Sequence, residues 1–557
     1  MNILGLYGAF GFDPWENPQD EYVHESGATL LKDGVFVTSI CEERLSKVKY
    51  DGRLPHLSVE YCLKAGNLSP EDIDFVYIAD SGQSSFYENW PTTKDKLCDY
   101  FINADVKMLN HHKCHAAAAI FTCDQEEGAF ITLDGSGSAI ITEGRCVGHE
   151  QSTLGYFNKK KKIFRIFQQH PWSNFFGMYY LCWAHDTYNK KTNQKIDFYN
   201  RKHRDTYCGK VMGLSAYGKP QLEDYNDFLT EELSTPSVQL VSHPKGELHS
   251  KEVDELSVED RAYFIQKNFE KGLIKYLEML KDQGYLEDNL CLSGGVFLNI
   301  LANTEIIKRD FAKNVHIPPF PSDCGLHLGA ACFGAYLQDE TITIPKNLAT
   351  LGIEYSDEEI KSALDRDDIE YQRYDSFDDL CDEVSRDLKD NKIIGWFQNK
   401  SEFGPRALGS RSLFMNAQLK ENKDLLNSKV KHREYWRPFA GIILEDYVEE
   451  YFEEGFKSPY MLFSQTIKKE KINSIEAICH EDQTCRIQTV NKDLHPQVNS
   501  LLEAYLKLTD SPVILNTSFN DNGQPIVETP KDAIETFLNL QVDTLAIGNY
   551  VVRKINQ

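Results

Sequence analysis

The alternation of apolar and polar positions near the N-terminus predicts two similar runs of strands. NILGLYG and GATLLKDGVFVTSICEE place short apolar runs around a Lys-Asp-Gly turn, and FITLDGSGSAIITEGRCVGHE repeats that order around a glycine-rich turn. Hairpin sequences of this kind also recur by chance, so the echo alone is a weak signal. It indicates an α/β fold whose N-terminal domain is duplicated.

Further downstream, the pattern predicts helices joined to strands by tight turns. Residues 110–119, NHHKCHAAAA, predict a helix because alanine is the best helix former. NLCLSGGVFLNILAN predicts a buried strand, a turn at Gly294 and Gly295, and a helix, an arrangement that brings backbone N–H groups close to phosphate. NVHIPPFPSDCGLHLGAACFGAYL predicts a strand, a proline-rich turn and a helix after Asp323. The pattern loosens over residues 342–352, which predicts a linker between domains at residues 1–345 and 353–557.

Composition narrows the class of protein. The chain has 557 residues, 41% of them hydrophobic, yet no window approaches the ~18 to 20 apolar residues of a membrane span, and the N-terminus lacks a basic leader. The 14 cysteines include no CxxC pair, which argues against a zinc ribbon or a disulfide scaffold. A net charge of −25 repels polyanions. We therefore expect a cytoplasmic protein whose partners include neither membrane nor nucleic acid.

Two histidines and two aspartates are candidates for a metal site. His111 and His115 are four apart, so both imidazoles lie on one face of the predicted helix. Asp134 ends a strand before a glycine loop and Asp323 precedes a helix, although a turn or an N-cap explains each aspartate alone. Together the four would give a ligand mixture suited to iron, manganese or zinc. The sequence alone leaves open whether they converge.

A basic region stands out in the acidic chain. Residues 400–437 contain nine Lys or Arg and only four acids. EFGPRALGSRS places Arg406 and Arg411 among glycines, and the guanidinium fork suits phosphate. A solvated surface explains the lysines of this region but not arginines among Gly, Pro, Trp and Phe. The pattern favours an anion site.

Ten ordered sequence blocks, spread over nearly the whole chain, carry a family resemblance. The blocks are CEERLSKVK, HHKCHAAAA, LDGSGS, GKVMGLSAYGKP, LSGGVFLN, PSDCGLHLGAA, EFGPRALGSRSL, KHREYWRPFA, RIQTV and SPVILNTSFN. The chain resembles the O-carbamoyltransferases of the nodulation-protein-U type, including cephem and tobramycin carbamoyltransferases. The resemblance implies an actin-like N-terminal domain, similar to tRNA threonylcarbamoyl-transfer enzymes, and a C-terminal α/β domain similar to threonylcarbamoyl-adenylate synthase.

The resemblance also assigns roles to individual residues. It implies that Fe(II) or another divalent metal is held by His111, His115, Asp134 and Asp323. Residues expected to bind carbamoyl phosphate and ATP are Arg406, Arg411, Lys431, Arg437, Arg486, Asn516 and Ser518. Residues expected to contact adenylate are Ser136, Gly137, Gly294, Gly295 and Asn299. His24 is the candidate base on the acceptor side of the N-terminal cleft, and Lys49 is expected near it. The expected catalytic set is His24, Lys49, Arg406, Lys431, Arg437 and Arg486.

The implied reaction is ATP-dependent O-carbamoyl transfer in the biosynthesis of secondary metabolites. Carbamoyl phosphate and ATP, the latter with Mg²⁺, would give carbamoyl-adenylate, whose carbamoyl group passes to a hydroxyl of a small natural product or sugar-like acceptor. Residues 8–23, GAFGFDPWENPQDEYV, are longer than the usual link in the family and are rich in aromatic and acidic residues. This insertion leaves the acceptor open, and the sequence also leaves open whether the protein is a homo-oligomer.

Two other classes of enzyme fit the sequence less well. An actin-like ATPase or sugar kinase would use the N-terminal cleft but needs neither the histidine pair nor the arginine-rich region. A tRNA-modifying threonylcarbamoyl-type transferase is disfavoured by the charge of −25 and by the lack of a basic stripe with aromatic residues between its charges. A non-enzymatic binding protein explains neither candidate site.

Overall fold

The structure is a computed structural model that describes residues 1–9, 23–81, 84–142, 145–170, 176–196, 204–221 and 251–555. The chain forms two compact units, each considered by itself. The first comprises Met1–Glu42 and Tyr50–Pro345, and the second comprises Glu43–Lys49 and Lys346–Gln557. Most of the insertion at residues 8–23 lies outside the described residues.

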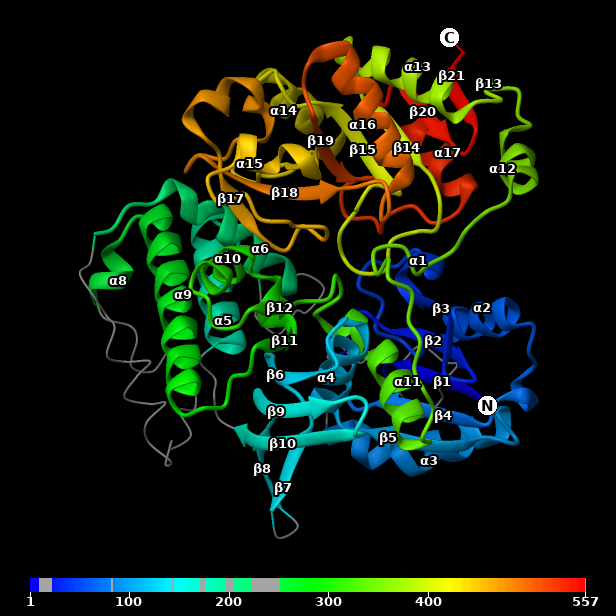
Figure 1. The fold of residues 1–557 in the computed structure, drawn as a ribbon, viewed down its shortest axis with the longest axis vertical. Coiled ribbons are helices and arrows are strands. Elements are labelled where there is room, and N and C mark those ends of the chain that lie inside the picture. Colours follow the sequence, from blue (N-terminus) through cyan, green and yellow to red (C-terminus); the bar gives the residue numbers. More distant parts are fainter. Residues whose placement is uncertain are drawn as a thin grey trace. The chain divides into compact units, whose positions relative to one another are not determined.

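The first unit begins with a five-stranded sheet in the order β3-β2-β1-β4-β5 (Figure 1). The strands are β1 (Asn2–Tyr7), β2 (Gly27–Lys32), β3 (Val35–Cys41), β4 (Phe75–Ala79) and β5 (Asp105–Leu109). β1 pairs antiparallel with β2 and parallel with β4. The β2–β3 turn uses Asp33 and Gly34, both with positive φ, as the Lys-Asp-Gly sequence predicts.

A second five-stranded sheet repeats this arrangement in the order β10-β9-β6-β11-β12 (Figure 1). Its strands are β6 (Glu127–Leu133), β9 (Ser152–Asn158), β10 (Ile163–His170), β11 (Asn289–Ser293) and β12 (Asn314–His316). β6 pairs antiparallel with β9 and parallel with β11, as β1 does with β2 and β4. The repeat confirms the predicted duplicated, actin-like α/β fold.

The sequence predicts a second run of strands, but it does not predict which of these strands pair beside β6. β7 (Ala139–Thr142) and β8 (Arg145–His149), which the sequence echo equates with β2 and β3, form a separate two-stranded hairpin. The sheet uses β9 and β10 instead. Both β7–β8 and β9–β10 have sequences that suit a hairpin, so the local sequence does not distinguish them. Packing against β6 decides which of the two hairpins joins the sheet.

The helices of the first unit include two that bring the candidate metal ligands together. These two are α4 and α11. The helices of the unit are α2 (His56–Gly66), α3 (Ser84–Tyr100), α4 (His111–Thr122), α5 (Gly177–Thr192), α6 (Arg204–Leu214), α8 (Lys251–Glu255), α9 (Val258–Asp282), α10 (Ile300–Lys308) and α11 (Leu326–Leu337). α4 packs closely on α11, since a Cβ on Gly329 would lie 1.9 Å from the Cys114 carbonyl oxygen. α11 also lies against β1, where Gly5 leaves room for its backbone. Small residues thus hold these three elements together.

The second unit is built on a nine-stranded sheet in the order β13-β21-β20-β14-β15-β19-β16-β18-β17 (Figure 1). The strands are β13 (Ile369–Arg373), β14 (Ile394–Phe397), β15 (Arg411–Asn416), β16 (Ala440–Leu444), β17 (Ser464–Thr466), β18 (Thr484–Val490), β19 (Val513–Ser518), β20 (Thr544–Ile547) and β21 (Tyr550–Lys554). The helices are α12 (Asp357–Leu364), α13 (Phe377–Lys389), α14 (Glu421–Leu426), α15 (Val448–Tyr451), α16 (Pro496–Thr509) and α17 (Pro530–Asn539).

Apolar side chains fill both faces of this sheet. Residues of α13 and α16 form one buried cluster with alternate strand residues, and residues of α12, α14 and α17 form the other. The unit also includes most of the short helix α1 (Glu42–Ser46), far earlier in the chain. Among the described residues, no helix combines the length and apolar character needed to cross a membrane.

Candidate functional site

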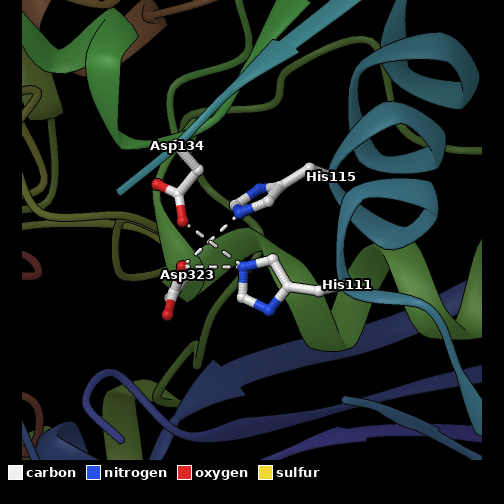
Figure 2. A group of neighbouring side chains, drawn as sticks. All are labelled: His111, His115, Asp134 and Asp323. Carbon is white, nitrogen blue, oxygen red and sulfur yellow. Dashed lines mark ion pairs between the residues drawn. The ribbon is translucent and has the colours of Figure 1, made fainter. Parts of the chain in front are cut away.

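The four predicted metal ligands converge in the first unit. Figure 2 shows His111 and His115, from α4, facing Asp134, which follows β6, and Asp323, which precedes α11. One donor atom from each lies within 4.8 Å of the others. The Nε2 atom of His111 is 3.5 Å from an Asp134 oxygen and 3.6 Å from an Asp323 oxygen, and His115 Nε2 is 3.4 Å from the same Asp323 oxygen.

The hydrogen bond made by His111 leaves its Nε2 atom available as a ligand at this point. His111 Nδ1 lies 2.7 Å from the Asp80 carbonyl oxygen. Because a carbonyl only accepts, Nδ1 carries the proton and Nε2 is left as a ligand atom. Among the described residues, the buried Nε2 atoms of His111 and His115 have no hydrogen-bond partner. A metal ion would satisfy both of these nitrogens, which would otherwise cost about 1–3 kcal/mol each.

Each aspartate offers one oxygen, because the chain holds the other. Asp134 Oδ1 accepts from the Gly295 N–H at 2.9 Å, which leaves Oδ2 facing His111. Asp323 Oδ2 accepts from the Tyr7 hydroxyl at 2.6 Å, which leaves Oδ1 facing both histidines. Four single donors would leave coordination positions for a substrate on most divalent metals.

The electrostatics of the cluster favour a cation. Burial disfavours a charge on His111, yet Asp323 and Asp134 outweigh it and raise the pKa of this imidazole well above its usual value. Burial likewise opposes ionisation of Asp323, but His111 and His115 hold the pKa of its carboxyl well below its usual range. Two carboxylates and two neutral imidazoles would balance the charge of a divalent ion. The residues therefore fit a divalent metal, without distinguishing iron from its neighbours.

His24 adjoins the cluster, and its role as the candidate base on the acceptor side stays a prediction. Its Nε2 atom is 3.9 Å from Asp323 Oδ2, and its Nδ1 atom is 3.7 Å from Glu25 Oε2. The buried Glu25 carboxylate accepts from the Ser322 hydroxyl at 2.8 Å and from the Cys324 N–H at 3.2 Å. Glu25 thus holds Ser322 and Cys324, the residues on either side of Asp323, through hydrogen bonds.

Sequence reasoning missed Tyr7 and Glu25. A signal for Tyr7 exists in the repeat: β1 and β6 are equivalent strands, Tyr7 ends β1, and Asp134 follows β6 directly. Equivalent strand ends in a duplicated domain face a shared cleft. Glu25 has a positive φ of 60°, which no sequence pattern indicates.

The glycines predicted to contact adenylate lie beside the metal ligands. Gly294 has a φ of 99°, and a Cβ there would come within 2.0 Å of the Leu133 carbonyl oxygen. Gly295 donates to Asp134, and a Cβ on Gly137 would press on the ring of the buried His112. These glycines are therefore needed for packing, and their contact with adenylate stays a prediction.

Ser136 and Asn299 differ from the glycines. Ser136 is exposed. The Asn299 side chain caps α10 by accepting from the Ala302 N–H at 3.1 Å, and it exchanges hydrogen bonds with Gln266. Asn299 thus has a structural task, and a role of either residue in adenylate binding stays a prediction.

The second unit concentrates cations. Burial together with the charge of Arg486 lowers the pKa of Arg406 well below its usual value. Burial and the charges of Arg437 and Arg486 do the same for Arg433. The pKa of Arg486 falls to about 10, chiefly through burial and partly through Arg437. Guanidinium groups that oppose one another's charge would be stabilised by a bound anion. Arg433 was not singled out from the sequence, although it belongs to the basic region.

Lys431, Asn516 and Ser518 lie together at the end of β19. The Lys431 Nζ atom donates to the Ser518 carbonyl oxygen at 2.6 Å and to Asn520 Oδ1 at 2.7 Å. The Asn516 Nδ2 atom donates to the Ala407 carbonyl oxygen at 3.0 Å, close to Arg406 in the chain. Burial, followed by the charges of Arg433, Lys49 and Arg437, lowers the pKa of Lys431 well below its usual value.

Arg411 and Lys49 are placed differently from the rest. Arg411 is completely buried, donates to backbone carbonyls that include those of Gln398 and Ile353, and stacks 3.6 Å above Phe397. This geometry favours a structural role, and its binding of substrate stays a prediction. Lys49, expected near His24, belongs to a segment of the second unit.

Comparison with known proteins gives matches over both units. Residues 19–90 and 84–332 match the family model for the carbamoyltransferase N-terminus, and residues 385–554 match that for the carbamoyltransferase C-terminus. Nodulation protein NolO of Bradyrhizobium diazoefficiens is 30% identical over 80% of this chain and 79% of its own. Nodulation protein NolNO of Sinorhizobium fredii is 29% identical over 100% of this chain and 83% of its own. Among solved structures, the chain is similar to HypF of T. kodakarensis over 61% of this chain and 48% of that one, at 12% identity and a TM-score of 0.34, which carries no functional inference.

Proposed function

Because the chain belongs to the carbamoyltransferase family and is a carbamoyltransferase enzyme, we propose that it performs ATP-dependent O-carbamoyl transfer in two stages. One observation supports this proposal above the others. A His/His/Asp/Asp cluster lies in the first unit and a group of partly buried cations lies in the second. Two sites of opposite character suit two chemical steps.

The second unit would form carbamoyl-adenylate. Water cleaves carbamoyl phosphate into carbamate and inorganic phosphate, and a carbamate oxygen then attacks the α-phosphorus of ATP while the bond to pyrophosphate breaks. Arg406, Arg437 and Arg486 would bind the phosphoryl oxygens and stabilise the charge that develops on them. Lys431, fixed by Ser518 and Asn520, adds positive charge at the same place. Mg²⁺ would accompany ATP.

The first unit would transfer the carbamoyl group. A divalent metal held by His111, His115, Asp134 and Asp323 would supply Lewis-acid polarisation of a carbamoyl oxygen. His24 would take the proton of the acceptor hydroxyl, because it lies beside Asp323 and is partly exposed. The acceptor oxygen then forms the new bond to the carbamoyl carbon, and AMP leaves. Glu25 would keep His24 oriented for this task.

The acceptor we propose is a small hydroxylated molecule, such as a natural product or a sugar. The acidic charge of the whole chain disfavours RNA as the acceptor. The aromatic and acidic residues of the insertion would stack on a sugar ring and accept hydrogen bonds from hydroxyls. This part of the proposal depends on the sequence, since most of the insertion lies outside the described residues.

Pyrophosphate release from ATP, measured with and without carbamoyl phosphate, tests the first stage. We expect release to require carbamoyl phosphate and to fall about tenfold or more in Arg437→Ala and Arg486→Ala, because each loses charge-assisted hydrogen bonds. Arg386→Ala is the matched control, since its side chain is 61% exposed and forms an ion pair with Glu383.

The rival classes of enzyme predict other outcomes in the same assay. A sugar kinase would release ADP instead of pyrophosphate and would ignore carbamoyl phosphate. Normal pyrophosphate release in both Arg437→Ala and Arg486→Ala would mean that the cation cluster is not the adenylate-forming site.

A further inference from the structure

The C-terminal end of α4 brings two cysteines together in the first unit. Cys123 is the C-cap residue of α4, and Cys291 lies in β11. Both belong to one buried apolar cluster, and α4 packs on β11. Cys291 pairs with His316 of β12, and the hydroxyl of Thr122, the residue before Cys123, lies 3.1 Å from His316 Nε2. The end of α4 therefore lies over the part of the sheet that contains Cys291.

The two thiols differ in how readily they ionise. The pKa of Cys123 falls to about 7, chiefly because the Cys291 thiol donates a hydrogen bond to it; burial opposes this fall, and the charge of Lys159 adds to it. Burial, followed by the hydrogen bond with Cys123, raises the pKa of Cys291 well above its usual value. At neutral pH, Cys123 is thus partly a thiolate while Cys291 stays a thiol.

The chain itself holds Lys159 beside Cys123. The Lys159 Nζ atom donates to the Cys123 carbonyl oxygen at 2.6 Å, and the Lys159 N–H donates to the Glu126 carbonyl oxygen at 2.9 Å. His316 also faces this end of α4, and burial together with the charge of Lys159 lowers its pKa to about 4, so that its imidazole is neutral at pH 7. Lys159 is therefore the cation that stabilises a thiolate at Cys123.

The more accessible sulfur of the pair is also the one that ionises. Cys123 is 6% exposed and Cys291 is 1% exposed, and both are free thiols. A small oxidant that reaches the pair from solvent therefore meets the thiolate first. A low-pKa thiol beside a second thiol is the arrangement in which oxidation ends in a disulfide.

We propose that Cys123 and Cys291 form a redox modification site, at which a hydroperoxide oxidises Cys123 and Cys291 converts the product into a disulfide. The Cys123 thiolate attacks one oxygen of hydrogen peroxide, the O–O bond breaks, and hydroxide leaves and takes a proton from solvent, so that Cys123 becomes a sulfenic acid. The Cys291 sulfur then attacks the Cys123 sulfur, the S–O bond breaks, and the Cys291 proton leaves with the hydroxyl group as water. The pair of thiols loses two electrons, which reduce the peroxide to water.

The disulfide would join two elements that support the His/His/Asp/Asp cluster. α4 carries His111 and His115, and β11 leads to Gly295, whose N–H holds Asp134. None of these residues takes part in the oxidation. The inference concerns the thiols alone and does not depend on the proposed function.

Mass spectrometry of the full-length protein, after mild treatment with hydrogen peroxide, tests the inference. Proteolytic mapping without reduction should show the peptides of Cys123 and Cys291 joined, with the loss of two hydrogen atoms. Cys291→Ser should stop at the sulfenic acid, which dimedone traps, and Cys123→Ser should give neither product. Cys98→Ser is the matched control, because Cys98 is less buried than either member of the pair, and it should form the disulfide at the wild-type rate.

A second pair of variants tests the role of Lys159 and leaves both cysteines in place. Lys159→Gln should slow formation of the disulfide about three- to tenfold at pH 7, because the thiolate loses a stabilising charge. Lys160→Gln, at the exposed neighbouring residue, should react as the wild type does. Equal rates in these two variants would overturn the assignment of Lys159 as the activating charge. Folded wild-type protein that is oxidised at other cysteines but never joins Cys123 to Cys291 would overturn the whole inference.

Discussion

At the scale of single residues, the candidate metal ligands could be predicted and their supports could not. The four-residue spacing of His111 and His115 indicates that they share a helix face, and the family resemblance indicates Asp134 and Asp323 as the other two ligands. The signal for Tyr7, which lies in the equivalence of β1 and β6, is weak because an apolar strand can also end in tyrosine for packing alone. The Tyr7 hydroxyl nevertheless holds Asp323 Oδ2 and leaves Oδ1 for the cluster.

Tyr7→Phe should therefore weaken metal binding without removing a ligand. Loss of the hydroxyl lets the Asp323 carboxylate rotate, and loss of such outer contacts typically reduces metal affinity about 10–100-fold. Competition between the enzyme and a chromogenic chelator for Mn²⁺ or Zn²⁺ measures the effect directly. Tyr77→Phe is the control, since Tyr77 is equally buried on β4 and its hydroxyl accepts from Gln338. Equal affinity in Tyr7→Phe and wild type would show that Tyr7 only packs.

At the scale of elements, local patterns predicted helices better than strand partners. The helix around His111 and the turn at Gly294 were both foreseen, because their signals lie within a few residues of one another. The choice of β9 and β10 over β7 and β8 was not, because pairing depends on residues far apart in the chain. α4 carries two of the four candidate metal ligands, His111 and His115, on one face.

His115→Ala on α4 should separate the two stages of the reaction. The variant loses a ligand of the first unit, so metal binding and carbamoyl transfer should both fall by about two orders of magnitude or more. The cation cluster belongs to the second unit, so carbamoyl-phosphate-dependent pyrophosphate release should continue. His56→Ala provides the control, because His56 is a partly exposed histidine of α2 that pairs with Glu60.

Metal removal by a chelator should reproduce the behaviour of His115→Ala. Loss of pyrophosphate release in folded His115→Ala protein would mean that the two stages are not divided between the units. Intact transfer with the metal removed would instead refute the role of the metal.

At the scale of the whole molecule, the two compact units are not two continuous pieces of chain. The loosened pattern at residues 342–352 drew attention to one crossing between units, near Pro345. No composition shift marks the crossings around Glu43–Lys49, because the contacts that assign this segment involve residues some 360 to 490 positions later. Sequence-local signals cannot reveal attachment of that kind.

The last prediction concerns a fragment of residues 346–557. Without the segment, Glu528 keeps the nearby charge of Arg411 but loses those of Arg44 and Lys47, and removing partners from a buried charge costs about 3 kcal/mol. Fusing residues 43–49 to the fragment through a flexible linker should therefore raise its midpoint of thermal unfolding by about 6–12 °C. The same fusion with Arg44→Ala and Lys47→Ala is the control and should give no rise. Identical melting of the fused and unfused fragments would show that the segment is a passive part of the second unit, whereas a rise confined to the unaltered fusion would establish it as a structural component of the adenylate-forming half.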